Sequence, residues 1–179
     1  MCDYLDQMAK QDELYEEAAR TFGPALERLA RGYEGDADKR RDLLQEIHVA
    51  LWRSLGSFDG KCSLRTWVYR VAHNRAASYV RWDRVKNPGN APIDEMEASF
   101  NPIDSEGAVD RKRAQDRLLY MVQRLPPLDR QIMLLYLEGM DNVSIAEIAG
   151  ISATNVGTKV HRIKGVLTRG IRKGGIDVR

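Results

Sequence analysis

Arginine, asparagine and tryptophan side chains are concentrated in residues 63–82, SLRTWVYRVAHNRAASYVRW. Guanidinium groups bind phosphates, an amide can hydrogen-bond a base edge, and an indole can stack on an unpaired base. At about 100° per residue, Arg70, Asn74 and Arg81 fall on one side of a helix. Trp67 lies at the border of that side. The pattern favours binding of single-stranded or partly opened nucleic acid, and a solvated helix face with a boundary tryptophan is the alternative.

The apolar residues of the same segment predict the face that packs against the rest of the protein. Ser63 is the expected N-cap of this helix. The predicted core face consists of Leu64, Val68, Val71, Tyr79 and Trp82. Arg75 falls on this apolar side, and the sequence does not indicate what it contacts.

A second polar pattern lies in residues 141–164, DNVSIAEIAGISATNVGTKVHRIK. Asp141 can cap a short helix, Gly150 can supply a left-handed turn residue, and Ser152 can cap the helix that follows. Two helices joined by a short turn with glycine are typical of a helix-turn-helix, whose second helix enters the major groove of DNA. A solvated helix of a small bundle is the alternative.

The second helix of this pattern has two distinct sides. Its predicted core side consists of Val156, Val160, Ile163 and Leu167. Its predicted outward side consists of Thr154, Asn155, Thr158, Lys159 and Arg162. Short hydrogen-bonding side chains followed by bases suit base edges and phosphates in the major groove.

A third surface is expected on residues 42–58, DLLQEIHVALWRSLGSF. The face opposite its leucines carries Asp42, Gln45, Glu46, Val49 and Trp52. An exposed tryptophan beside a valine, rimmed by acids and an amide, resembles a protein-binding patch. The alternative is that Trp52 packs on the first helix.

Charge is segregated along the chain. Residues 61–86 hold seven bases and one acid, residues 93–110 hold six acids and no base, and residues 159–179 hold seven bases and one acid. Two basic zones flanking an acidic segment indicate two contacts with a polyanion, separated by a segment that avoids it.

Composition excludes several classes of protein. The chain has 179 residues, 43% hydrophobic and 30% charged, and no apolar run of the roughly 18 residues that a membrane span needs. Without an apolar leader it is expected in the cytoplasm, with Cys2 and Cys62 as unpaired thiols. No metal-ligand set, nucleophile–base pair or phosphate loop is present, so we expect no metal, no cofactor and no enzymatic activity.

Helical periodicity without strand alternation predicts an all-α fold of two small helical domains. Residues 12–33 and 38–57 are predicted helices, with breaks near Gly23-Pro24 and Gly35-Asp36. Further helices are expected at 109–125, 128–138, about 142–149 and from 153 onward. The predicted domains span 1–86 and 111–179, joined by a flexible acidic linker over 87–110.

Taken in order, three blocks resemble a bacterial sigma factor of the extracytoplasmic-function (ECF) type, in the sigma-70 family of RNA polymerase subunits. The blocks are DLLQEIHVALWRSLGSFDG, CSLRTWVYRVAHNRAASYVRW and LPPLDRQIMLLYLEGMDNVSIAEIAGISATNVGTKVHRIKGVL. They cover about half the chain, in the family's order and spacing. The resemblance implies that core RNA polymerase and promoter DNA are partners, and it leaves room for an anti-sigma factor.

The family's roles can be carried over to matching positions. Binding to the clamp of the polymerase is implied for Asp42, Gln45 and Glu46, with Val49 and Trp52 extending the face. Capture and opening of the minus-10 element is implied for Phe58, Lys61, Ser63, Arg65, Trp67, Arg70, Asn74, Arg81 and Arg84. Contact with the minus-35 element is implied for Thr154, Asn155, Thr158, Lys159 and Arg162.

Two positions depart from the family pattern. Lys39-Arg40-Arg41 stands where acids usually precede the clamp-binding helix, which predicts weaker docking or a compensating partner or modification. Gly157 stands where a base is common in the recognition helix, which predicts an unusual promoter preference. Two rivals to a sigma factor remain at this point: a stand-alone helix-turn-helix regulator, and a sigma mimic that sequesters an anti-sigma factor.

Overall fold

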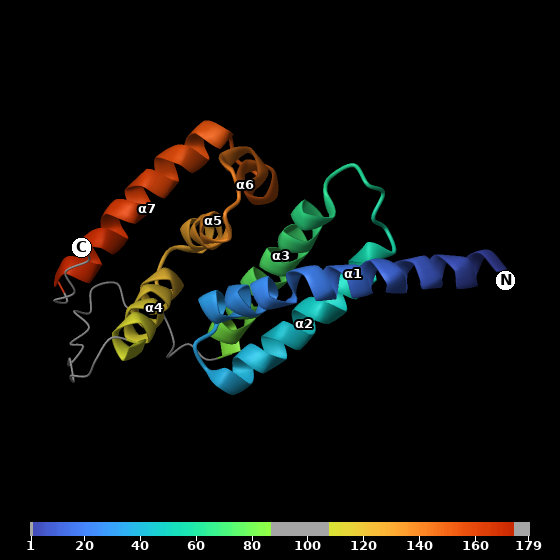
Figure 1. The fold of residues 1–179 in the computed structure, drawn as a ribbon, viewed down its shortest axis with the longest axis horizontal. Coiled ribbons are helices and arrows are strands. Elements are labelled where there is room, and N and C mark those ends of the chain that lie inside the picture. The colour runs from blue at the N-terminus through green and yellow to red at the C-terminus, as the bar shows by residue number, and fades with distance from the viewer. Residues whose placement is uncertain (1, 87–107, 174–179) are drawn as a thin grey trace.

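The computed structural model describes residues 2–86 and 108–173, and within them the side chains of 7–82 and 114–171. These residues form seven α-helices and no strand (Figure 1), which confirms the all-α prediction. The N-terminal unit consists of α1 (Cys2–Tyr33), α2 (Ala37–Leu55) and α3 (Leu64–Lys86). The C-terminal unit consists of α4 (Ala108–Gln123), α5 (Pro127–Leu137), α6 (Asn142–Ala149) and α7 (Ala153–Lys173). Most of the predicted acidic linker falls outside the described residues.

Within the described ranges, none of the helices has both the length and the apolar character of a membrane span.

The α2 helix is defined by a cap and by one apolar stripe. Asp36 accepts hydrogen bonds from the backbone N–H groups of Asp38 and Lys39, each 3.0 Å long, and so satisfies two donors at the helix start. The stripe consists of Leu43, Ile47, Leu51 and Leu55, spaced four residues apart and all buried. This stripe packs α2 against both α1 and α3.

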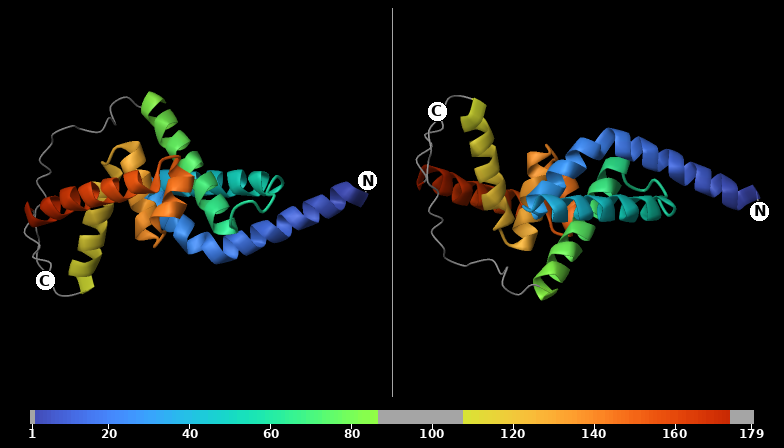
Figure 2. Two further views of the ribbon diagram at one scale, coloured as in Figure 1. Left: turned by 90° about the horizontal axis from the view of Figure 1, so that it is seen from above. Right: turned by 90° about the horizontal axis from the view of Figure 1, so that it is seen from below.

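The predicted break of the first helix at Gly23-Pro24 is wrong. Pro24 lies inside a continuous α1, and the helix bends along its length (Figure 2). Proline removes one backbone donor and crowds the preceding turn, which bends a helix without ending it when both sides are held by packing. Here Ala18 precedes the proline and Leu26 and Leu29 follow it, and all three are buried in the core.

The core face of α3 is centred differently from the prediction. Val68 is buried as expected, but the buried positions that follow it are Tyr69, Ala72, His73 and Ala76. Trp82, predicted in the core, is 55% exposed. The physical reason is that α2 begins at Ala37. The hydroxyl of Tyr79 donates to the carbonyl of Lys39, close to that first residue (3.3 Å), so Trp82, one turn further along α3, lies beyond α2.

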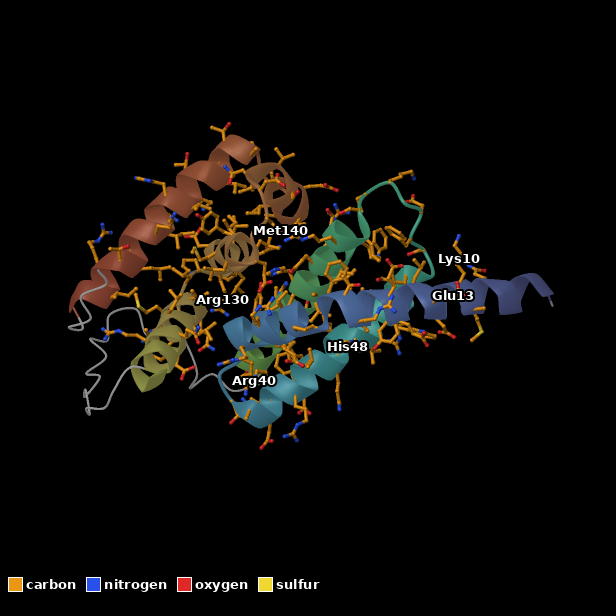
Figure 3. The ribbon with its side chains drawn as sticks, in the orientation of Figure 1. Lys10, Glu13, Arg40, His48, Arg130 and Met140 are labelled. Carbon is orange, nitrogen blue, oxygen red and sulfur yellow. The ribbon has the colours of Figure 1, made fainter. Side chains whose placement is uncertain are left out.

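In the C-terminal unit, α5 is enclosed by the other helices. Pro127 stands in its first turn, where its missing N–H has no helical acceptor to lose. Ile132, Met133, Leu134 and Leu135 are all buried, because α5 packs against α4, α6 and α7 and also against α1 and α3. Arg130, labelled in Figure 3, is buried and donates to the backbone carbonyls of the turn between α4 and α5.

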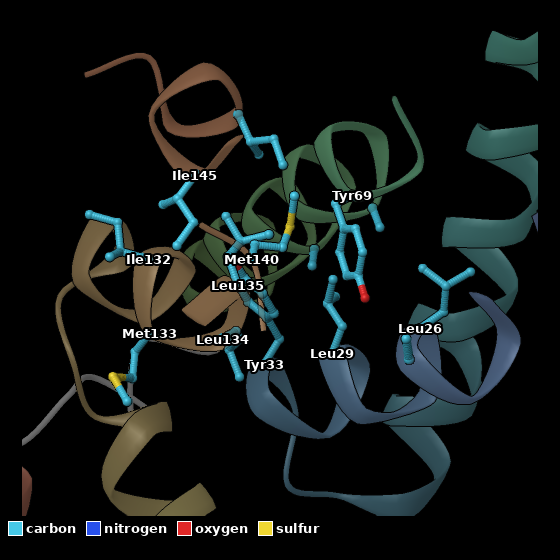
Figure 4. Close-up of a cluster of buried hydrophobic side chains, with 14 of the residues drawn as sticks. Leu26, Leu29, Tyr33, Tyr69, Ile132, Met133, Leu134, Leu135, Met140 and Ile145 are labelled. Atoms are coloured by element: carbon cyan, nitrogen blue, oxygen red, sulfur yellow. The ribbon is translucent and has the colours of Figure 1, made fainter. Parts of the chain in front are cut away.

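The two units share one hydrophobic core. Leu29 and Tyr69 of the N-terminal unit lie beside Leu134 and Met140 of the C-terminal unit (Figure 4). Gly32 permits a close approach of the two units, since a Cβ atom at that position would lie 2.4 Å from a methyl of Leu134.

A buried polar chain crosses the same boundary. Tyr33, the last residue of α1, forms a 2.9 Å hydrogen bond with Nδ1 of His73, and the guanidinium of Arg130 lies 5.5 Å from the centre of the Tyr33 ring. Burial lowers the pKa of His73 from 6.5 to about 3. The Nε2 atom of His73 is buried without a partner, so a proton gained by the ring would add charge at a site with no compensation.

The protein should therefore lose stability in mild acid. Because the pKa of His73 is lower in the folded chain than in the unfolded chain, the unfolded state binds the extra proton between about pH 6.5 and pH 3. The free energy of unfolding, measured by urea titration, should fall as the pH is lowered through this window. The variant His73→Gln should show a shallower fall, and the exposed His161→Gln should behave as the wild type; identical profiles for all three proteins would contradict this.

Candidate nucleic-acid and protein interfaces

The helix-turn-helix has the caps that the sequence predicts. The carboxylate of Asp141 accepts from the backbone N–H groups of Val143 (2.9 Å) and Ser144 (3.0 Å) at the start of α6. Gly150 ends α6 with a φ of 70°, a left-handed conformation that costs glycine little. The hydroxyl of Ser152 accepts from the backbone N–H of Asn155 (3.2 Å) and caps α7. The turn between the two helices is thus confirmed.

The two sides of α7 are also as predicted at most positions. Val156, Val160, Ile163 and Leu167 are buried against α5 and α6. Thr154 and Asn155 are exposed in the first turn of α7, where a recognition helix contacts base edges. Thr158 is exposed, and its hydroxyl donates to the carbonyl of Thr154 (3.1 Å).

One buried carboxylate forms ion pairs with both basic residues of the set predicted to contact the minus-35 element. Asp129, in the first turn of α5, has a side chain only 7% exposed and lies 2.9 Å from Nζ of Lys159. Arg162 pairs with the second oxygen of the same carboxylate. The Lys159 side chain is 22% exposed and that of Arg162 is 62% exposed, so Lys159 ties α7 to α5 while Arg162 remains open to solvent. The predicted outward position is confirmed for Arg162 and is wrong for the partly buried Lys159, and nothing in the sequence indicated Asp129 as their partner.

Gly157 is not required by lack of space. A Cβ atom there would approach only the side-chain amide of Asn142, at 3.4 Å, and the helix has an ordinary backbone at this point. A longer side chain can therefore project from α7 at this position.

The predicted protein-binding face lies open on α2. Asp42, Gln45, Glu46, Val49 and Trp52 are all exposed. The indole N–H of Trp52 donates to the carboxylate of Asp12 on α1 (2.8 Å), and the side-chain amide of Gln11 donates to the carbonyl of Trp52 (2.7 Å). Trp52 thus combines both alternatives that the sequence left open, because it is tied to the first helix and still 37% exposed.

Arg75, which the sequence left unplaced, pairs with Glu46. The guanidinium reaches from α3 to the carboxylate on α2, and both side chains are partly exposed. Glu46 belongs to the predicted polymerase-binding set, so this pair links that face to the helix predicted to open DNA.

Two arginines of the basic segment at the start of α2 have partners close by in the chain. Arg40 donates to the carbonyl of Gly35 (3.2 Å), and Arg41 lies 3.5 Å from Asp38. Positive side chains oppose the dipole at a helix N-terminus, and the carboxylates of Asp36 and Asp38 offset this.

The loop before α3 is built around an aromatic contact. The rings of Phe58 and Trp67 meet edge to face with centroids 5.3 Å apart, and the indole N–H of Trp67 donates to the hydroxyl of Ser54 (3.0 Å). Trp67 therefore anchors the loop to the end of α2, and its role in stacking on an unpaired base stays a prediction. The hydroxyl of Ser63 accepts from the backbone N–H of Thr66 (3.0 Å), which confirms Ser63 as the cap of α3.

Lys61 is held at the tip of this loop. Its ammonium lies 2.6 Å from the carboxylate of Asp59, and its backbone N–H donates to the same group (3.1 Å). Gly60 between them has a φ of 75°, so the loop turns sharply here. The ammonium lowers the pKa of Asp59, and the carboxylate raises the pKa of Lys61.

The α3 side chains predicted to contact the minus-10 element differ in how exposed they are and in what they contact. Asn74 and Arg81 are exposed on α3. Arg70 pairs with Glu147 of α6 (2.8 Å), and Arg65 donates to the carbonyl of Glu138 at the end of α5 (2.8 Å). The side chain of Arg84 lies outside the described residues.

Comparison with protein-family models matches two parts of the chain. Residues 18–84 match Sigma-70 region 2, and residues 115–166 match Sigma-70 region 4.

Among curated proteins, the chain is similar to the RNA polymerase sigma factor NccH of Alcaligenes xylosoxydans xylosoxydans, with 27% identity over 92% of this chain and 91% of that protein. It is 30% identical to the ECF RNA polymerase sigma-E factor of Escherichia coli (strain K12), over 68% of this chain and 66% of that protein.

Two solved structures share the fold. CnrH, solved in complex with the cytosolic domain of CnrY, superposes with a TM-score of 0.67 at 18% identity and covers 94% of both chains. RpoE of Bartonella quintana, solved with the anti-sigma factor NepR, superposes with a TM-score of 0.67 at 18% identity, over 88% of this chain and 96% of that chain.

Because Asp129 pairs with both Lys159 and Arg162, its charge should contribute to the stability of the fold. Removing its charge in Asp129→Asn leaves the partly buried ammonium of Lys159 without its anionic partner and should lower the free energy of unfolding by about 2 kcal/mol. The matched control is Asp116→Asn, which breaks the more exposed pair with Arg31 and should cost at most about 1 kcal/mol. Urea denaturation measures both, and equal losses would show that Asp129 does not secure α7.

Proposed function

Since the chain belongs to the sigma-70 family and is an RNA polymerase sigma factor of the ECF type, we propose that its three surfaces divide the work of promoter recognition. The α2 face binds core RNA polymerase, the loop and α3 bind the opened minus-10 strand, and α7 contacts the minus-35 element. We assign the work to two domains, 1–86 and 111–179, joined by the acidic segment 87–110. The protein acts in the cytoplasm, where polymerase and promoter DNA meet, and has no catalytic chemistry of its own.

The observation that carries this assignment is the two-sided α7. Four apolar side chains are buried while Thr154 and Asn155 face solvent directly after the turn at Gly150. A helix N-terminus with exposed hydroxyl and amide groups suits base edges in the major groove. The guanidinium of Arg162 pairs with Asp129 but is mostly exposed, which supports a contact with a phosphate.

Opening of the duplex follows from the chemistry of the loop and α3. Extruding a base costs a few kcal/mol, and stacking with hydrogen bonds can offset about 1–3 kcal/mol per base. The contact between Phe58 and Trp67 holds the loop in place, while Asn74 and Arg81 stand exposed along α3. These groups support capture of unstacked bases without an energy source beyond binding.

An anti-sigma factor is part of the proposal. RpoE of Bartonella quintana was solved with the anti-sigma factor NepR, and it shares the fold of this chain. A sigma mimic that binds only such a factor fits less well, because the chain keeps exposed Asn74 and Arg81 on α3 and exposed Thr154 and Asn155 on α7.

Replacing Arg70 and Asn74 by Ala should stop promoter opening while polymerase binding persists. Loss of contacts to one or two bases should lower run-off transcription by roughly 10-fold to 100-fold with purified core polymerase. The control is Arg20→Ala, which removes an exposed basic side chain of α1 outside all three surfaces and should transcribe normally. Loss of polymerase binding by the double variant would overturn the assignment of α3.

A basic side chain at residue 157 should strengthen contact with the minus-35 element. Gly157→Arg adds a phosphate contact, which should steepen the salt dependence of holoenzyme binding to promoter DNA by about one counterion. Gly157→Ala is the control, because it gains the ~1 kcal/mol of helix propensity without the charge. The same salt slope for both variants would show that this position does not face DNA.

A further inference from the structure

The carboxylate of Asp129 pairs with one largely covered cation and one exposed cation of α7. Its Oδ1 atom lies 2.9 Å from Nζ of Lys159, and its Oδ2 atom accepts a hydrogen bond from the guanidinium of Arg162. Only 22% of the Lys159 side chain is exposed, whereas 62% of the Arg162 side chain is exposed. Arg162 is therefore the cation that a DNA phosphate can reach from solvent.

Asp129 itself is fixed within the C-terminal unit. It lies in the first turn of α5, which packs against α4, α6 and α7, and its side chain is only 7% exposed. Pro126, the residue before α5, offers no side-chain cap, and the positive end of the helix dipole favours a negative charge in this turn. The carboxylate consequently stays in place when a partner moves away from it.

A movement of Arg162 toward DNA would leave Asp129 with Lys159. In the part of the chain that the structure describes, the carboxylate has no cationic partner besides these two. A buried carboxylate that keeps one close ion pair remains compensated, whereas a buried carboxylate that loses every partner is strongly destabilising. Arg162 can therefore leave Asp129 at low cost only while Lys159 remains.

The two cations also differ in what they bind best. The ammonium of Lys159 is a compact point charge, which can neutralise a carboxylate without a particular orientation. The guanidinium of Arg162 is planar and has five N–H donors, a geometry that matches phosphate oxygens. The exposed cation is thus the one suited to the DNA backbone, and the covered cation is the one suited to the carboxylate.

We propose that Lys159 is a positioning residue of minus-35 recognition, which keeps Asp129 neutralised so that Arg162 can exchange the carboxylate for a DNA phosphate. The inference rests on the proposed role of α7. It gives Lys159 no contact with DNA, in place of the direct contact that the family resemblance implies. The phosphate contact of Arg162 then depends on both cations.

The test uses holoenzyme reconstituted from core polymerase and the full chain. The probe is a short fluorescent duplex that carries the minus-35 element of an active promoter and no minus-10 element. Anisotropy at several KCl concentrations gives the Kd and its salt dependence. Lys159→Gln should weaken binding about 10-fold and lower the salt slope by about one counterion, because Arg162 then stays on Asp129. Lys159→Met, which keeps the apolar stem, is a second variant and should give the same result.

The decisive variant is Asp129→Asn/Lys159→Gln, which removes the carboxylate together with its covered partner. Arg162 is then no longer held, so the Kd should return to within about 2-fold of the wild-type value and the salt slope should equal that of the wild type. The double variant has no unpaired buried charge, so it is expected to fold even where Lys159→Gln does not.

The control is Lys164→Gln, which removes one positive charge from the same helix. The ammonium of Lys164 lies 3.0 Å from the hydroxyl of Tyr136, and the residue belongs to none of the proposed surfaces. This variant should keep the wild-type salt slope and change the Kd less than about 2-fold.

The salt slopes separate three roles of Lys159. A double variant whose slope stays one counterion below that of the wild type would show that Lys159 itself contacts a phosphate, contrary to the proposal. Wild-type slopes in Lys159→Gln and Lys159→Met would also contradict it, because a purely structural lysine changes the fraction of folded protein and not the number of phosphates bound.

A duplex with a scrambled minus-35 element separates this inference from the proposed function. If the wild-type holoenzyme prefers the promoter duplex while the double variant binds as weakly as Lys159→Gln, only the positioning role is refuted. If the wild-type holoenzyme shows no preference between the two duplexes, the role of α7 is refuted, and the inference fails with it.

Discussion

The side chain of Tyr33 is buried where the two helical units meet, and the arrangement of the other helices depends on its contacts. Its hydroxyl bonds to His73 of α3, and its ring faces the guanidinium of Arg130 of α5. Arg130 in turn holds the turn between α4 and α5 through backbone carbonyls. One turn of α1 therefore orients α3, α4 and α5 together, and Gly32 beside it lets Leu134 complete the packing. A polar group at this boundary that lost its partner would be costly, which favours one arrangement of the units over many.

Several basic side chains of this protein are ion-paired within the chain, so a bound nucleic acid would exchange one anionic partner for another. Several bases of the predicted DNA-binding sets have acidic partners within the chain: Lys159 and Arg162 share Asp129, and Arg70 pairs with Glu147. Binding a nucleic acid at such positions replaces a carboxylate by a phosphate, so part of the electrostatic gain is offset by the internal pair that is broken. With the DNA contacts proposed above, such a surface would discriminate against weak or non-specific polyanions. Asn74 and Arg81 are among the side chains that remain exposed and are available for a first contact with nucleic acid.

Local features could be predicted from the sequence with good accuracy. The caps at Ser63, Asp141 and Ser152 and the left-handed Gly150 were all expected, because each depends on residues within one helical turn. Pro24 misled the prediction, since a proline ends an isolated helix but only bends one whose two halves are buried. Trp82 misled it as well, since periodicity shows which side of α3 is apolar but not where α2 begins beside it.

The sequence by itself determined the helical class, the caps at Ser63, Asp141 and Ser152, the apolar side of α7 and the exposed face of α2, and from these blocks the family. Tertiary structure alone decided which charged groups meet. Arg75 finds Glu46 and Lys159 finds Asp129 on other helices, about thirty residues away along the chain. Arg70 finds Glu147 across the boundary of the two units. The physical reason is range: a cap or an apolar stripe depends on neighbours within four residues, whereas an ion pair between helices exists only after their packing has set the distance.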